Sequence, residues 1–175
     1  MFSLESFKID LKGMEKDEQT LTFDITDAFF EAIKAPAVQH GHLTTTLTIR
    51  RLGESFDLLF HTEGSVIVAC DLCLDDMDQP ILTDDHLVAQ FGDAYAEDDD
   101  TVTIPENEGV LDVSWFIYEF IELNIPLRHV HATGKCNPAM MNILKEHSAA
   151  RSGDGDGEHE TDSRWSALKD LHLDN

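Results

Sequence analysis

The chain has 175 residues, enough for one domain with a hydrophobic core, and 42% of them are hydrophobic. Its 12 Lys and Arg residues stand against 35 Asp and Glu residues, which gives a formal net charge of −23. No stretch approaches the roughly 18 apolar residues that a membrane span needs, and the opening MFSLESFKID is too charged for a secretory signal. Three cysteines, an odd number, favour a reducing cytoplasmic compartment over a disulfide framework.

The negative charge is concentrated in one part of the sequence. Between Arg51 and Arg128 lie 76 residues that include 19 Asp or Glu and no Lys or Arg. Because nucleic-acid affinity depends mostly on cations that neutralise phosphates, we do not expect this surface to bind RNA or DNA directly. A basic protein would be attracted to it. The alternative is an acidic surface that serves only solubility.

The N-terminal part predicts two strands and a short helix. Apolar and polar residues alternate with period two at 7–14 and 19–25, which is typical of strands. Asp27 is positioned to cap a helix over 28–34, and Pro36 then ends it.

A series of β-branched and aromatic runs follows. These runs lie at 42–52, 54–62, 65–70 and 79–91. The breaks at Gly53–Glu54 and Glu63–Gly64 are short and contain glycine, so we expect a hairpin at each and an antiparallel meander overall. The loop at 92–100 is too charged to pack and should be exposed.

The next part predicts a strand and two helices. After a short strand at 101–104, Asp112 is a candidate N-cap for a helix that reaches residue 123. Apolar residues share one face of this helix, with the spacing i, i+3, i+4, i+7, i+8: Val113, Phe116, Ile117, Phe120 and Ile121. That stripe should cover one side of the sheet. A second, short helix is expected at 137–147.

The C-terminal part predicts a linker and a tail. Residues 148–162 are small, polar and glycine-rich, so they cannot bury enough surface to offset chain entropy. Residues 163–175 regain helical spacing through Trp165, Leu168 and Leu171. A helix this short is marginal alone, so it must dock on the domain, bind a partner or stay disordered.

Cys70 and Cys73 form a C-x-x-C with three interpretations. A thioredoxin-like redox pair needs a helix after the second cysteine, but Pro80 leaves no room for one, and nearby aspartates should raise the thiol pKa. A zinc site needs a second pair of ligands, which the segment RHVHATGKC at 128–136 offers. The resulting Cys3His set would be closed and structural, with the ligands Cys70, Cys73, His131 and Cys136. Against zinc, no glycine follows Cys73. The third interpretation is that the thiols are packed in the protein without a metal.

Three ordered motifs resemble the YceD-like family, which is named for the large ribosomal RNA subunit accumulation protein. They are CDLCLDDMDQPI, then GVLDVSWFIYEFIELNIPLRHVH, then DSRWSALKDL at 162–171. The resemblance runs from about Val66 to Leu171. The C-x-x-C matches the family pattern, whereas His131 and Cys136 stand where many relatives have cysteines, and Ser163 stands where a proline is common.

The resemblance implies a non-catalytic cytoplasmic protein that supports accumulation of large-subunit ribosomal RNA in ribosome assembly. From the charge we expect a basic protein partner, such as a ribosomal protein or a large-subunit assembly intermediate. The residues expected to bind that partner are Glu97, Asp98, Asp99, Asp100, Trp165, Leu168 and Leu171. Two other functions stay open: a thiol-disulfide or redox-sensing protein using the C-x-x-C, and a small-molecule-binding barrel.

The expected architecture is one α+β domain over residues 1–147. It should hold a strongly bent antiparallel sheet, open or barrel-like, with the 112–123 helix packed against it. The linker at 148–162 and the helical tail at 163–175 should follow.

Overall fold

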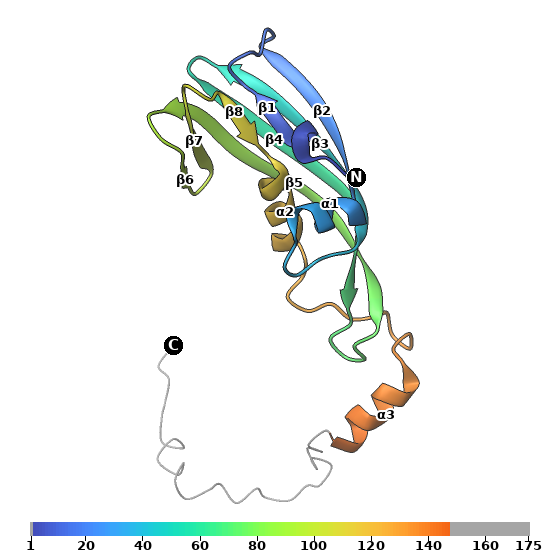
Figure 1. Cartoon of the computed structure of the whole chain (residues 1–175). Helices are drawn as coiled ribbons and strands as arrows, with labels where there is room; N and C mark the ends of the chain where they lie inside the picture. The colour runs from blue at the N-terminus through green and yellow to red at the C-terminus, as the bar shows by residue number, and fades with distance from the viewer. Residues whose placement is uncertain (1, 148–175) are drawn as a thin grey trace, which may run out of the picture.

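The structure is a computed structural model of the whole chain, and it describes residues 2–147 (Figure 1). The fold is α+β, as predicted, with a six-stranded sheet of order β2-β3-β4-β5-β7-β6 and a two-stranded sheet of order β1-β8. The strands are β1 (Lys8–Asp10), β2 (Glu18–Thr26), β3 (Gly41–Leu52), β4 (Ser55–Ala69), β5 (Asp76–Gly92), β6 (Ala96–Asp98), β7 (Thr101–Pro105) and β8 (Val110–Asp112). The helices are the 3-10 turn η1 (Leu4–Phe7), α1 (Asp27–Ile33), α2 (Ser114–Leu123) and α3 (Pro138–His147). The predicted linker and tail lie outside the described residues.

The large sheet is a mostly antiparallel meander that stays open. Strands β2 to β5 pair with their sequence neighbours, and β2 and β6 form the two edges, so the sheet is not a barrel. The hairpin predicted at Gly53 joins β3 to β4. The meander ends at β5, because β7 pairs with it in parallel. Within the loop predicted at 92–100, residues 93–100 are exposed, although three of them form β6.

The second predicted hairpin, at Glu63–Gly64, is wrong. Strand β4 runs through this point without a break and pairs with β5 from Ser55 to Ala69. Gly64 has φ 144°, and a Cβ there would lie 2.3 Å from the carbonyl oxygen of His42. Glycine is needed here because the neighbouring strand approaches closely, which a single sequence does not distinguish from a turn.

One face of the large sheet is covered and holds the core. Strands β1 and β8 and helices α1 and α2 lie over it (Figure 1). The predicted stripe of α2 is confirmed: Val113, Ile117 and Ile121 are fully buried. Tyr118 is also buried, and its hydroxyl accepts the N–H of Ala37 at 3.2 Å.

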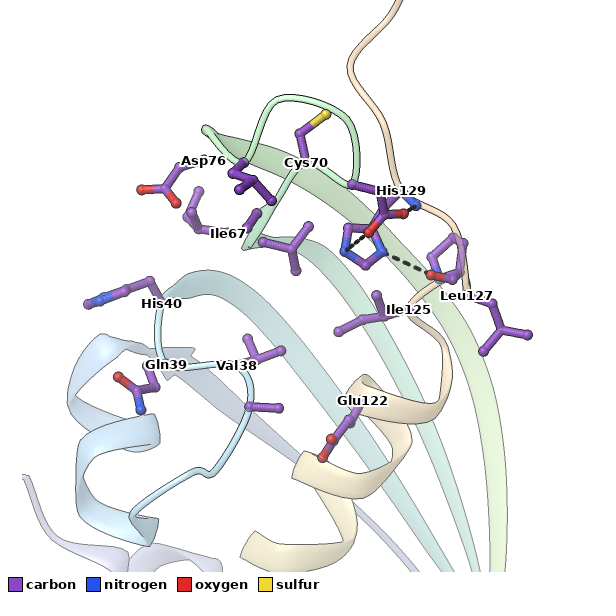
Figure 2. Close-up of a pocket in the computed structure, with 16 residues that line it drawn as sticks. Val38, Gln39, His40, Ile67, Cys70, Asp76, Glu122, Ile125, Leu127 and His129 are labelled. Carbon is purple, nitrogen blue, oxygen red and sulfur yellow. Dashed lines mark hydrogen bonds and ion pairs between the residues drawn. The ribbon is translucent and has the colours of Figure 1, made fainter. Parts of the chain in front are cut away.

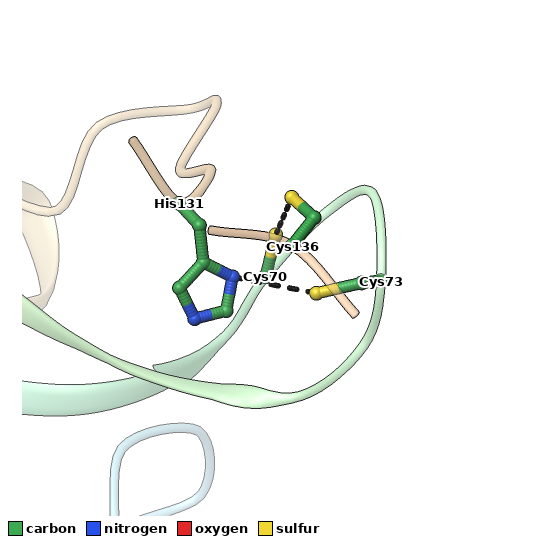
Figure 3. Close-up of side chains that lie close together, drawn as sticks. All are labelled: Cys70, Cys73, His131 and Cys136. Atoms are coloured by element: carbon green, nitrogen blue, oxygen red, sulfur yellow. Dashed lines mark hydrogen bonds between the residues drawn. The ribbon is translucent and has the colours of Figure 1, made fainter. Parts of the chain in front are cut away.

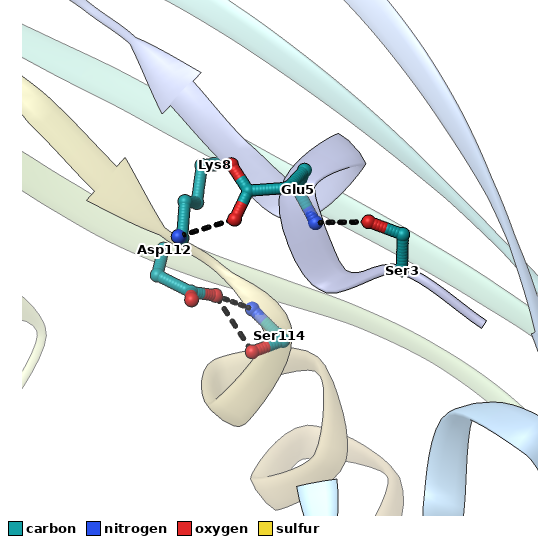
Figure 4. A network of polar contacts seen from close by, with 5 residues as sticks. All are labelled: Ser3, Glu5, Lys8, Asp112 and Ser114. Atoms are coloured by element: carbon teal, nitrogen blue, oxygen red, sulfur yellow. Dashed lines mark hydrogen bonds and ion pairs between the residues drawn. The ribbon is translucent and has the colours of Figure 1, made fainter. Parts of the chain in front are cut away.

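Polar contacts fix the strand that leads into α2. Lys8 pairs with Asp112 across the small sheet, and its ammonium lies 2.7 Å from Glu5 (Figure 4). The carboxylate of Asp112 accepts the N–H of Ser114 at 2.9 Å and its hydroxyl at 2.6 Å. Asp112 therefore satisfies a first-turn donor of α2 from the residue before the N-cap position, Val113.

Asp27 does not cap α1 as predicted. It is the first residue of the helix, and its carboxylate accepts the N–H of Gly41 at 2.9 Å and lies 3.1 Å from Nδ1 of His40. The hydrogen bond from Gly41, followed by that from His40, lowers the pKa of Asp27. Asp27 thus ties the segment between α1 and β3 back onto the helix.

Strands β4 and β5 extend past the rest of the sheet. Pairing between β3 and β4 stops at Gly41 with Val66, whereas β4 and β5 continue to Ala69 with Asp76. We call residues 67–78 the arm. Helix α3 lies beyond its tip and buries no residue (Figure 1). Within residues 2–147, no helix is both long and apolar enough to cross a membrane.

We expect Gly64→Ala to lower the free energy of unfolding more than Gly53→Ala. Both glycines have positive φ, which costs an alanine about 1–3 kcal/mol. Only at position 64 would the new Cβ meet backbone atoms, and such overpacking costs about 1–3 kcal/mol more. Urea unfolding of the two variants measures the difference. Equal destabilisation would contradict the close approach at Gly64.

Candidate metal centre

The tip of the arm places two cysteines side by side in a tight turn. The N–H of Cys70 donates to the carbonyl of Asp75 at 2.9 Å, and that of Leu74 donates to the carbonyl of Cys70 at 2.9 Å. Both Cys70 and Cys73 are buried. Leu74 has φ 62° and is 68% exposed, so the backbone takes the left-handed form that glycine favours without a glycine.

The chain after α2 returns across this tip and brings the second pair of candidate ligands to it. Nδ1 of His131 lies 3.3 Å from Sγ of Cys73, and Sγ of Cys136 lies 3.9 Å from Sγ of Cys70 (Figure 3). The four candidate ligand atoms all lie within 4.8 Å of one another. The structure thus brings together the four predicted residues, which we call the Cys3His cluster.

Hydrogen bonds join the two segments beside the cluster. The N–H of Asp71 donates to the carbonyl of His129 at 3.0 Å, and the N–H of His129 donates to the Asp71 carboxylate at 2.8 Å. The amide of Asn137 donates to Asp75 at 3.1 Å. His129 therefore braces the arm and is not part of the cluster. Sequence reasoning gave no role to this contact, because its partners are 58 residues apart.

Backbone donors set the electrostatics of Cys70. Burial alone would raise the pKa of its thiol, but N–H groups of His131, Cys73 and Leu72 and the side chain of Cys73 lower it to about 6. The pKa of Cys70 is thus lowered, whereas the sequence, with aspartates close to the thiol, led us to expect a raised value. Burial and the neighbouring Cys70 and Cys73 sulfurs raise the pKa of Cys136 to about 11. The site therefore favours at least one thiolate, which is the form that binds metal.

The geometry fits a tetrahedral zinc ion. A Zn–S bond of about 2.3 Å separates two sulfurs by about 3.8 Å, and a Zn–N bond of about 2.0–2.1 Å places nitrogen about 3.5 Å from sulfur. One sulfur–sulfur pair, Cys70 with Cys136, lies at 3.9 Å, one sulfur–nitrogen pair, Cys73 with His131, lies at 3.3 Å, and all four atoms lie within 4.8 Å of one another. Four protein ligands leave no open position for substrate, so an ion held here would be structural.

The other predicted site residues lie away from the cluster. Glu97 to Asp100 are exposed on β6 and the turn after it, far from the tip of the arm (Figure 1). Glu97 accepts a hydrogen bond from the hydroxyl of Tyr95. Trp165, Leu168 and Leu171 lie outside the described residues.

The fold and the cluster define a class: an α+β protein whose long hairpin carries a C-x-x-C at its tip. Residues 58–172 match the sequence model of the family described as "Large ribosomal RNA subunit accumulation protein YceD". The chain belongs to this family, as its motifs suggested. The match starts within β4 and covers β5, α2 and the whole cluster. No curated protein and no solved structure matches the chain.

We expect Asp71→Ala to loosen the segment that crosses the arm. The change removes the carboxylate that accepts the N–H of His129, a partly exposed bond worth about 1 kcal/mol. Hydrogen exchange of the His129 amide should accelerate. Asp78→Ala removes a carboxylate that is also exposed on the arm, and it serves as the control. The same acceleration in both variants would contradict the brace.

Proposed function

We propose that this protein is a non-catalytic cytoplasmic accessory factor in assembly of the large ribosomal subunit. Its family description connects it with accumulation of large-subunit ribosomal RNA. We propose further that it acts by binding a basic protein, either a free ribosomal protein or one within a large-subunit assembly intermediate.

The observation that carries the binding proposal is the uninterrupted negative charge of 52–127. This segment forms strands β4 to β8 and helix α2, and its 19 carboxylates have no Lys or Arg between them in the sequence. In the fold, Lys8 and Arg50 of the neighbouring strands β1 and β3 lie opposite Asp112 and Asp57, so these two acids are partly balanced. The acids at 97–100, on the edge strand and the turn after it, are all exposed. Such a field attracts a basic protein over long distances and repels the phosphates of RNA.

The burial of the C-x-x-C supports a non-catalytic role. Cys70 and Cys73 are 0% and 1% exposed, whereas thiol-disulfide exchange needs an accessible sulfur. Strand β5 begins at Asp76, so no helix follows the pair. One observation favours the redox alternative, namely the lowered pKa of Cys70. The same N–H donors would stabilise a thiolate bound to zinc.

Neutralising the acids at 97–100 is expected to weaken partner binding several-fold, because it removes four charges from the surface that attracts the partner. The variant carries Glu97→Gln, Asp98→Asn, Asp99→Asn and Asp100→Asn. Binding is measured as co-sedimentation of tagged protein with large-subunit assembly particles in low-salt lysate. Added salt should weaken the wild-type interaction as well.

The control changes four exposed acids outside 52–127 and so alters the net charge equally. It carries Glu15→Gln, Asp17→Asn, Asp24→Asn and Glu31→Gln. An equal loss in both variants would show that only net charge matters. Capture of no ribosomal or assembly protein by the wild type would refute the proposal.

We also propose that the Cys3His cluster holds one structural zinc ion. Elemental analysis of the purified, untagged protein should find about one equivalent of zinc. His131→Ala removes a ligand and should release the metal, whereas His129→Ala, two residues away, should retain it. Less than about one-tenth of an equivalent in the wild type, with a full thiol titre, would rule the site out.

A further inference from the structure

A groove of about 690 Å³ opens beside the arm. Three segments form it: the loop between α1 and β3, the arm, and residues 122–129, which include the end of α2 and the chain after it (Figure 2). Because β3 stops pairing at Gly41, no strand among residues 2–147 pairs with the arm on this side. The groove is a consequence of how far β4 and β5 extend past their neighbours.

The groove has an apolar floor and an acidic rim. Val38 is buried, and Val68 and Ile125 are partly buried against the core, so the floor continues the core surface. Leu127 lines the groove and is fully exposed. The rim carries the carboxylates Asp71, Asp76 and Glu122, and no Lys or Arg of the described residues lines it. This chemistry suits an amphipathic segment with basic side chains beside its apolar stripe.

The C-terminal sequence has that composition. In RWSALKDL at 164–171, Trp165, Leu168 and Leu171 recur with helical spacing. Only three basic residues follow position 147, and two of them, Arg164 and Lys169, belong to this short segment. The family match extends to residue 172 and so includes it.

The chain length allows this segment to return to the groove. Asn137 contacts Asp75 at the tip of the arm, and the ten residues of α3 lead about 15 Å away from it. Residues 148–162 are fifteen residues of glycine-rich sequence, whose root-mean-square span is about 20–23 Å. This span exceeds the length of α3, so the tether is long enough for the tail to return toward the arm, and tethering raises its effective concentration at the groove.

We propose that residues 163–171 dock in cis in this groove of the free protein. Trp165, Leu168 and Leu171 face the apolar floor, and Arg164 and Lys169 face the acidic rim. This goes beyond the proposed function, since it concerns the protein without a partner. A partner that takes up the tail must first displace it from the groove.

The fluorescence of Trp165 tests the docking. The chain has two tryptophans, and Trp115→Phe leaves Trp165 as the only one. In this background of the full chain, we expect an emission maximum at short wavelength and several-fold weaker acrylamide quenching than in urea. Leu127→Asp, inside the groove, should restore strong quenching. Leu123→Asp, at an exposed leucine of α2 outside the groove, is the matched control and should not.

A second variant, Leu168→Asp, changes the tail and leaves the sequence of the folded domain as it is. If the tail covers the groove, this variant should accelerate hydrogen exchange of the Val68 and Ala69 amides, which line the groove, several-fold. Strong quenching of Trp165 in the protein that carries Trp115→Phe alone would overturn the proposal. Equal effects of Leu127→Asp and Leu123→Asp on this quenching would overturn it too. Protection that rises with protein concentration, together with a dimer in sedimentation equilibrium, would place the tail on a second copy and also overturn it. No partner is present, so these results stand apart from the test of partner binding.

Discussion

The ladder between β4 and β5 is the constraint on which the other features depend. It pairs fifteen residues on each strand, from Ser55 with Gln90 to Ala69 with Asp76. It is longer than the pairing of β4 with β3 and that of β5 with β7. The excess length forms the arm. The arm positions the C-x-x-C at its tip and one wall of the groove at its side. The strands of the ladder also carry many of the acidic residues.

An arm of two strands needs support, because an isolated hairpin is marginally stable in water. The segment after α2 provides it twice. Asp71 and His129 exchange two hydrogen bonds between the arm and this segment, and the Cys3His cluster lies directly beside them. The two contacts have different roles. The hydrogen bonds hold the segment after α2 against the arm, and in this position His131 and Cys136 lie close enough to Cys70 and Cys73 to share one metal ion.

Sequence patterns predicted the features that follow from periodicity and residue type. The stripe of α2, most of the meander and all four members of the Cys3His cluster fall in this group. Gly64 was misread because turns and close strand approach demand the same residue. The left-handed Leu74 and the contact between Asp71 and His129 had no signal, since each depends on how distant segments meet. The parallel pairing of β7 with β5 likewise appears only once the sheet is assembled.

Zinc K-edge X-ray absorption of the purified protein is the most direct test of whether a zinc ion in the Cys3His cluster links the arm to the segment after α2. We expect three sulfur neighbours at about 2.3 Å and one nitrogen neighbour at about 2.0 Å, from the side chains of the Cys3His cluster. A shell of oxygen and nitrogen alone, or a protein that carries no zinc, would contradict it. The arm would then be held by the contacts of Asp71 and Asn137 without a metal.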